Sequence, residues 1–215
     1  GWHLFEEAVQ AGVTIEKIFA LESYRDQLSA FPQIVWVSEE ILRDLADTQT
    51  PQGIVAVIQK EEVGPPDFSQ GKFLFLEDVQ DPGNVGTMIR TADAAGLTGV
   101  IVSDKSADIY SLKTLRSMQG SHFHLPIYRM PVATFIEEAK KSNLPILATT
   151  LSRDSKDYRE LSPLENFALV MGNEGQGISP IMAESANQLV HIGMKGRAES
   201  LNVAVAAGIL MFYFS

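Results

Sequence analysis

The most distinctive chemical pattern in the sequence is the segment GNEGQG, which runs from Gly172 to Gly177. Its glycines follow the order GxxGxG, which differs from the GxGxxG of a dinucleotide loop and from the GK[ST] of a P-loop. The segment contains Glu174 but no lysine or arginine, so it disfavours phosphate as a ligand. A nucleoside that carries positive charge, such as the sulfonium compound S-adenosylmethionine, fits better, because backbone groups of Gly172, Ile192 and Leu201 can hold it between apolar walls. The alternative is that the glycines serve only a tight turn.

The elements predicted around this segment place it where ligands bind. Phe167–Met171 is a continuous apolar run that predicts a buried strand, and Ser179-Pro180 predicts a helix start, so the loop is confined to residues 172–178. Gln188–Ile192 is predicted as a second strand, followed by a loop and a long apolar helix that begins near Ser200. Because ligands bind at the carboxyl ends of the strands of an open parallel sheet, we expect both loops to line one pocket.

A second pair of polar residues, Asn84 and Arg90, accompanies a predicted βαβ unit. Phe73 to Leu76 is an apolar strand, residues 85–95 are a helix, and residues 100–102 are the next strand. Asn84 is expected just before the helix and Arg90 about a turn and a half into it, so both can face one cleft. The alternative is that Asn84 only caps the helix and Arg90 is solvated.

Three segments together resemble a known family. LEDVQDPGNVGTMIRTADAAGLTGVIV (residues 76–102), GNEGQGIS (172–179) and SLNVAVAAGILMFY (200–213) resemble, in order, the three motifs of the SpoU/TrmH family of RNA 2′-O-methyltransferases, of the SPOUT superfamily. The motifs cover most of the chain after Gly71, and three matches with correct spacing are far more specific than a lone glycine pattern. The resemblance implies an α/β catalytic domain with helices on both faces of a parallel sheet and a C-terminal deep trefoil knot.

The resemblance also implies S-adenosylmethionine as methyl donor and assigns site residues. Around the reacting ribose hydroxyl it places Arg90, Asn84, Glu174, Ser200 and Asn202. Around the cofactor it places Thr149, Gly172, Glu174, Gly177, Ile192, Met194 and Leu201. Arginine has a pKa above about 12, so we interpret Arg90 as a clamp on a phosphate or nascent alkoxide rather than as a base. Ser200 has an alternative role as N-cap of the last helix. Two positions depart from the common family pattern: Gly193 stands where proline is frequent, and Gln176 where arginine is frequent.

The amino-terminal part of the chain predicts a small α/β unit. An initial helix is followed by strands over residues 15–21, 33–38 and 53–59, and by helices over residues 23–31 and 39–47. This unit resembles the ribosomal-protein-like substrate-binding domain of many SpoU-type enzymes, although the basic segment that usually starts that domain does not precede Gly1 here. We therefore predict an RNA-binding domain at 1–60, a linker at 61–70 and a catalytic domain at 71–215.

The segment between the motifs offers one metal hypothesis. Residues 112–119 predict a helix, and the GSHFHLPIY that follows would place His122 and His124 on one face of a strand. No third ligand is spaced nearby, so we favour a structural role for both and predict no metal. A further helix at 132–141 and a strand at 145–150 follow, with Thr149 at the end that faces the pocket.

Charge and composition limit how the chain can bind its substrate. It has 17 basic and 27 acidic residues, a net charge of −10, which argues against binding nucleic acid by bulk electrostatics. RNA binding would then be local. The basic residues near the motifs are Arg90, Lys113, Arg116, Lys195 and Arg197.

Two further features bear on where the protein works and on whether it forms a dimer. The sequence contains no cysteine, which fits a reducing cytoplasm. The apolar run Val203–Phe214 is about half the length that a bilayer requires, so it predicts a core helix or a dimer interface and no membrane span. The resemblance implies a homodimer in which each active site includes residues of the partner.

Together these features predict an S-adenosylmethionine-dependent RNA 2′-O-ribose methyltransferase. We favour ribosomal RNA over transfer RNA, because no basic terminal extension is present. The alternatives are a transfer RNA 2′-O-methyltransferase and a non-catalytic RNA-binding or ribosome-assembly protein with the same fold. A nucleotide-dependent oxidoreductase is excluded by the glycine order.

Overall fold

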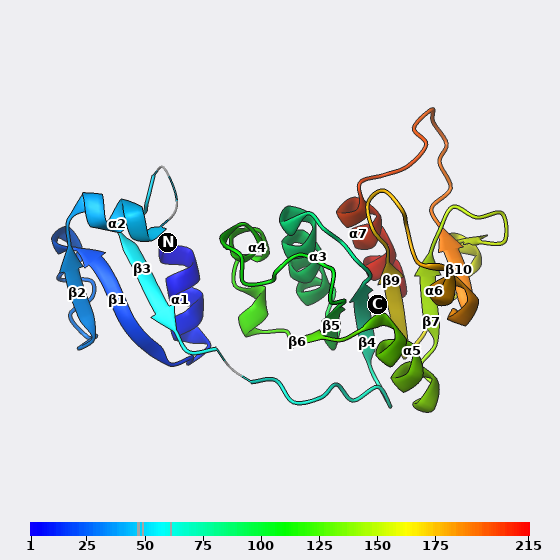
Figure 1. The fold of residues 1–215 in the computed structure, drawn as a ribbon, viewed down its shortest axis with the longest axis horizontal. Coiled ribbons are helices and arrows are strands. Elements are labelled where there is room, and N and C mark those ends of the chain that lie inside the picture. The colour runs from blue at the N-terminus through cyan, green and yellow to red at the C-terminus, as the bar shows by residue number, and fades with distance from the viewer. Residues whose placement is uncertain (47, 49, 61) are drawn as a thin grey trace. The chain divides into compact units, whose positions relative to one another are not determined.

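The chain forms two compact units. The computed structural model describes residues 1–46, 48, 50–60 and 62–215. Contacts divide the chain into Gly1–Glu62 and Val63–Ser215, and each unit has its own sheet (Figure 1).

The first unit is a small α/β fold, as the sequence predicts. Its central strand β1 (Ile15–Leu21) pairs in parallel with β2 (Ile34–Val37) and antiparallel with β3 (Ile54–Ile58). The helices are α1 (Trp2–Gln10) and α2 (Glu39–Ala46). A separate core, centred on Phe5, Ile18, Ala20, Leu28 and Ile54, holds the unit together.

The helix predicted over residues 23–31 is not present. The structure has a short 3₁₀ helix, η1 (Glu22–Tyr24), followed by turns over residues 25–30. The hydroxyl of Ser29 donates to the carbonyl of Asp26 at 3.0 Å, a local bond that competes with helical backbone pairing. The last residue of the other helix predicted here, Asp47, lies outside the described residues.

The second unit contains a seven-stranded sheet with the order β6-β5-β4-β9-β7-β10-β8. All recorded pairings in it are parallel, which confirms the predicted parallel sheet. The strands are β4 (Lys72–Leu76), β5 (Gly99–Val102), β6 (Ile127–Arg129), β7 (Ile146–Thr149), β8 (Lys156–Asp157), β9 (Phe167–Met171) and β10 (Gln188–His191). The helices are α3 (Pro82–Ala94), α4 (Leu112–Met118), α5 (Val132–Lys141), α6 (Pro180–Ser185) and α7 (Val203–Phe214), with 3₁₀ turns η2 (Ser121–Phe123) and η3 (Tyr158–Glu160).

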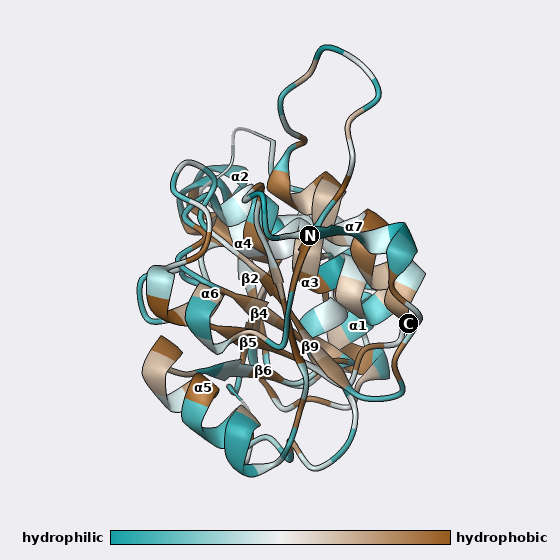
Figure 2. Ribbon diagram, turned by 90° about the vertical axis from the view of Figure 1, so that its right-hand side faces the viewer, coloured by the Kyte–Doolittle hydropathy of each residue, from teal (hydrophilic) through white to brown (hydrophobic). Residues whose placement is uncertain are grey.

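Helices cover both faces of this sheet. Alternate residues of β4 point to opposite faces, so Leu74 and Leu76 join the core beneath α3 and α7, whereas Phe73 and Phe75 join the core beneath α5. Figure 2 shows the apolar strands lying between these two helical layers. The double burial explains why β4, β5 and β9 read as continuous apolar runs.

Three helix starts or local elements differ from the sequence prediction. Helix α3 begins at Pro82 and is capped by Asp81, so Asn84 lies inside the helix rather than before it. Helix α7 begins at Val203, and its N-cap is Asn202 rather than Ser200. His122 and His124 lie in and next to η2 and not on a strand.

Two further findings apply to the part of the chain that the structure describes. No helix there is long and apolar enough to cross a membrane, and no group of three or more potential ligand side chains is arranged to hold a metal ion. The trefoil knot stays a prediction.

Candidate cofactor and catalytic site

The carboxyl ends of four central strands lie at one edge of the parallel sheet. Leu76 at the end of β4 pairs with Met171 at the end of β9, and Thr149 at the end of β7 pairs with Val190 of β10. The segments that leave β4, β9 and β10, residues 77–81, 172–179 and 192–202, therefore start from the same edge. This is the edge at which the sequence predicts one shared pocket.

The glycine segment after β9 is a closed loop folded around Asn173. The backbone groups of Asn173 and Gly177 exchange two hydrogen bonds, of 3.0 and 2.9 Å. The side-chain oxygen of Asn173 accepts from the N–H groups of Gly175 and Gln176, and its amide nitrogen donates to the carbonyl of Asp78 at 2.8 Å. Sequence reasoning missed Asn173, although asparagine beside glycine is a frequent turn signal.

Two of the predicted cofactor glycines are needed by the loop itself. A Cβ atom on Gly172 would collide with the backbone of Gly177 and Ile178. Gly177 has a φ of +71°, in the left-handed region that glycine adopts at little cost. The closure of the loop thus explains why glycine stands at both positions, whatever ligand the loop holds.

A chain of hydrogen bonds joins the three motif segments. The amide nitrogen of Asn84 donates to Glu174 Oε1 at 3.1 Å, and Asn84 Oδ1 accepts from the amide nitrogen of Asn202 at 3.1 Å. Asn202 Oδ1 in turn accepts from the backbone N–H groups of Ala204 and Val205, at 2.9 and 3.3 Å. A carboxylate only accepts and a backbone N–H only donates, so both ends fix the orientation of the two amides. The Glu174–Asn84–Asn202 chain brings together three of the five predicted catalytic residues.

The carboxylate of Glu174 is held at the start of α3. Its two oxygens also accept from the backbone N–H groups of Gln80 and Asp81, each at 3.1 Å. Burial by itself raises the pKa of Glu174, but the hydrogen bonds from Asn84, Asp81 and Gln80 outweigh it and lower this pKa. Glu174 is therefore an ionised acceptor at neutral pH.

The other two predicted catalytic residues, Arg90 and Ser200, are not part of the Glu174–Asn84–Asn202 hydrogen-bond chain. Arg90 is six residues beyond Asn84 in the same helix, which corresponds to about 9 Å along the axis and a face turned by roughly 120°. Arg90 and Ser200 are both exposed, and neither makes a side-chain hydrogen bond or ion pair with any residue the structure describes. The hydrogen-bond chain around Glu174 therefore includes neither of them.

The predicted cofactor residues beyond the glycine loop lie near the same strand ends. The hydroxyl of Thr149 donates to the carbonyl of Val170 at 2.9 Å, which ties the end of β7 to β9. Ile192 and Met194 follow β10 and are half-buried, and Leu201 is 37% exposed. These side chains leave apolar surface open to a ligand.

A buried acid lies behind the glycine loop. Glu77, the first residue after β4, is 2% exposed, and its Oε2 accepts from the backbone N–H of Ser179 at 3.1 Å. Its Oε1 has no partner among the described residues. Burial raises the pKa of Glu77. Sequence reasoning did not single out this residue, although an acid directly after a buried strand is a usable signal.

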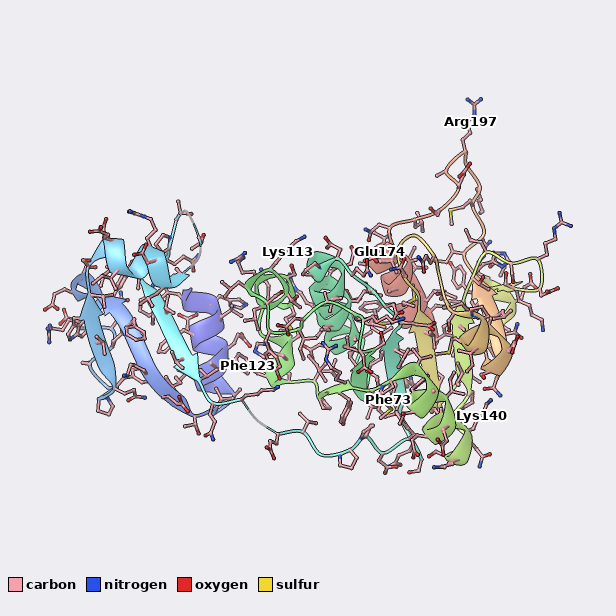
Figure 3. The ribbon with its side chains drawn as sticks, in the orientation of Figure 1. Phe73, Lys113, Phe123, Lys140, Glu174 and Arg197 are labelled. Carbon is pink, nitrogen blue, oxygen red and sulfur yellow. The ribbon has the colours of Figure 1, made fainter. Side chains whose placement is uncertain are left out.

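The predicted basic residues are spread over several elements. Lys113 on α4 donates to Asp81 Oδ2 at 2.8 Å, so part of its charge is already paired. Figure 3 shows Lys113 and Arg197 on opposite sides of Glu174, with Arg197 at the tip of the loop between β10 and α7. Lys113 and Arg197 therefore do not belong to one cluster.

An all-parallel sheet with a glycine loop and an ionised carboxylate at its carboxyl edge is typical of α/β enzymes that bind a nucleoside cofactor. Comparisons with known proteins make the class specific. Residues 71–212 match the SpoU rRNA Methylase family, and residues 1–56 match the MRM3-like substrate binding domain. The chain belongs to the SpoU rRNA methylase family, and it is an S-adenosylmethionine-dependent RNA 2′-O-ribose methyltransferase.

Individual relatives agree over nearly the whole chain. The 23S rRNA (guanosine(2553)-2′-O)-methyltransferase RlmP of Bacillus subtilis is 40% identical over 99% of this chain and 86% of its own length. The crystal structure of an AdoMet-bound rRNA methyltransferase from Sinorhizobium meliloti has a TM-score of 0.87 at 32% identity, covering 99% of this chain and 84% of that one. The SpoU methyltransferase AviRb from Streptomyces viridochromogenes, in complex with AdoMet, has a TM-score of 0.84 at 28% identity, with 99% and 86% covered. The family, fold class and cofactor predicted from the sequence are thereby confirmed.

Proposed function

We propose that this enzyme methylates a ribose 2′-hydroxyl of ribosomal RNA at the site built on the Glu174–Asn84–Asn202 chain. The observation that carries the proposal is this chain of hydrogen bonds, because it joins all three motif segments at the carboxyl edge of the sheet. Ribosomal RNA is the substrate named for the Bacillus relative, which aligns with 99% of this chain.

The residues present suit S-adenosylmethionine. The glycine loop carries no cationic side chain and the nearby carboxylate is ionised, so the site favours a cationic ligand over a phosphate. Apolar surface for adenine is available on Ile192, Met194 and Leu201. The residues that would hold the cofactor are Thr149, Gly172, Glu174, Gly177, Ile192, Met194 and Leu201. When bound, S-adenosylmethionine supplies a methyl group attached to a positively charged sulfur.

Positioning accounts for the role of the amide chain. The lowered pKa of Glu174 makes it a weak base, and amides do not take up protons near neutral pH. Glu174, Asn84 and Asn202 therefore hold the glycine loop, α3 and the start of α7 in one geometry, which fixes the ribose relative to the methyl group.

Arg90 and Ser200 have a different role in this proposal. The guanidinium of Arg90 holds a substrate phosphate or the developing alkoxide, while the proton of the hydroxyl passes to the adjacent phosphate. Ser200 faces the same ribose. Both side chains are free of partners within the described chain, which fits residues that act on a substrate or on a second protomer.

The surface of α7 supports a homodimer. Val205, Ile209 and Phe212 are 53%, 36% and 61% exposed, whereas the opposite face of the helix is buried in the core. Their spacing of four and three residues puts them on one stripe, which a symmetric partner can cover. We propose that this interface brings Arg90 of one protomer to the site of the other.

The amino-terminal domain, residues 1–60, is proposed to hold RNA and residues 71–215 to carry the cofactor, joined by a linker at 61–70. The match of residues 1–56 to a substrate-binding domain supports this division. Ribosomal RNA as substrate and the absence of cysteine from the sequence support a cytoplasmic location.

Mapping ribose methylation in cells with and without the gene tests the proposal. Loss of one 2′-O-methyl group from ribosomal RNA is the expected result. Loss from transfer RNA instead would support the transfer RNA alternative. Unchanged methylation of both, together with RNA binding by the purified protein, would support the non-catalytic alternative.

A further inference from the structure

The loop that follows β10 is fixed at its start by an acid from a different strand. The backbone N–H of Gly193 donates to Asp157 Oδ2 at 3.1 Å. Asp157 lies on β8, the edge strand, where it pairs in register with His191, the last residue of β10. The contact therefore fixes the chain two residues after the sheet ends, between Ile192 and Met194.

Asp157 is itself held in place. Arg159 donates from Nε to Oδ1 and from a terminal nitrogen to Oδ2, each at 2.8 Å, and its backbone N–H donates to Oδ1 at 3.0 Å. The Asp157 side chain is only 14% exposed in this pair. The hydrogen bonds from Arg159 hold the pKa of the Asp157 carboxyl well below its usual range. The carboxylate is thus ionised and limited to one orientation.

The next residue connects the pair to the last helix. Tyr158 makes an edge-to-face contact with Tyr213 of α7, with ring centroids 4.8 Å apart. The hydroxyl of Tyr213 donates to the carbonyl of Leu161 at 2.9 Å. The short segment 156–161 is therefore anchored at both the sheet and α7, and it gives Asp157 a rigid base.

Glycine at position 193 leaves room for this contact in its present geometry. A Cβ atom there would lie 2.5 Å from Asp157 Oδ2, closer than non-bonded atoms approach. Proline would lack the N–H that the carboxylate accepts. The residue at 193 and the acid at 157 are therefore matched to one another.

We propose that Asp157 is a positioning residue for the cofactor loop, acting through the Gly193 N–H to hold the backbone of Ile192 and Met194 in the conformation that binds S-adenosylmethionine. The inference rests on the proposed role of Ile192 and Met194 in the cofactor site. A preorganised loop binds its ligand without the ordering cost that a free loop pays on binding. Asp157 does not touch the reacting atoms, so its effect falls on cofactor binding rather than on the chemical step.

Calorimetric binding of S-adenosylmethionine and steady-state kinetics on the full chain test this role. Asp157→Ala is expected to bind S-adenosylmethionine about tenfold more weakly and to raise its KM by a similar factor, because a charge-assisted hydrogen bond is lost. The kcat at saturating cofactor and the KM for RNA are expected to stay within about twofold. Asp157→Asn keeps an oxygen for the Gly193 N–H and is expected to lose about threefold.

Two further variants keep the test decisive. Asp154→Ala, an exposed acid in the same connection, is the matched control and should bind as the unchanged protein does. Arg159→Gln keeps the Asp157 carboxylate but no longer holds it in one orientation. About a threefold loss of S-adenosylmethionine affinity is therefore expected, and this variant can be measured even if Asp157→Ala does not fold. If Asp157→Ala and Arg159→Gln both bind S-adenosylmethionine as tightly as the unchanged protein, the positioning role of Asp157 is wrong. The cofactor site itself would still stand. Failure of the unchanged protein to bind S-adenosylmethionine would overturn the cofactor site and this inference with it.

Discussion

Replacing Asn84 by aspartate tests the amide chain at its centre. In the protein, Asn84 donates to Glu174 and accepts from Asn202, each at 3.1 Å. Asn84→Asp keeps an oxygen for Asn202 but puts a second carboxylate where the donor to Glu174 was. The substitution therefore replaces the hydrogen bond to Glu174 with a repulsion between two carboxylates and keeps the hydrogen bond from Asn202.

The size of the effect follows from the distance. Two unit charges about 3 Å apart repel by roughly 1 kcal/mol in water and by roughly 5 kcal/mol at an effective dielectric constant of 20. Glu174 is solvent-exposed, so a value near 2 kcal/mol is appropriate. This predicts about a thirtyfold fall in kcat/KM at pH 8.

The pH dependence gives the sign of the effect. Like charges raise the pKa of one carboxyl of the new pair, so lowering the pH returns a proton that can bridge the two groups. The deficit of Asn84→Asp relative to the unchanged enzyme should therefore shrink as the pH falls. The assay is kcat/KM of both proteins from pH 5.5 to 8.5, with Asn84→Ala as control because it has no titrating group at this position. Full activity of Asn84→Asp at pH 8, or a deficit that does not change with pH, would show that the hydrogen bond from Asn84 to Glu174 does not matter for catalysis.

Three other predictions concern the loop, the amino-terminal unit and α7. Gly172→Val should reduce S-adenosylmethionine affinity by at least about tenfold, because its side chain collides with residues 177 and 178; calorimetry that finds unchanged affinity would contradict the loop geometry. Removal of residues 1–60 should leave cofactor affinity unchanged and abolish RNA binding, and a folded remainder that no longer binds cofactor would show that the domain division is wrong. Phe212→Asp should convert a dimer to a monomer in light scattering with loss of methylation, because it puts a charge on the exposed stripe of α7; an active monomer of the unchanged protein at micromolar concentration would rule out the shared site.

Much of the fold of the catalytic domain can be predicted from the sequence, because the residues that are buried in the sheet also form recognisable apolar runs along the chain. Strands buried on both faces read as continuous apolar runs, and β9 and α5 have the limits that the sequence predicts. The helix starts at α3 and α7 were misplaced, since each is preceded by more than one good capping residue. Asp81 and Asn84 compete at one, and Ser200 and Asn202 at the other.

The contacts that build the site were beyond sequence reasoning. Asn84 meets Glu174 across 90 positions and Asn202 across 118, and no local pattern encodes such a pairing. The two-residue strand β8 is too short to produce a period, so the acid at Asp157 and its contact with Gly193 went unnoticed. The motifs located the candidate residues, but the tertiary fold decides which of them meet.

Transfer of a labelled methyl group in a purified system would show directly whether the protein methylates ribose in ribosomal RNA. The protein would be incubated with labelled S-adenosylmethionine and ribosomal RNA from cells that lack the gene, and the modified nucleotide would be mapped by its resistance to alkaline cleavage. We expect label on the ribose 2′-oxygen of one nucleotide, at a rate reduced by Asn84→Asp. Label on a base, or no label from a folded protein that binds S-adenosylmethionine and RNA, would contradict it.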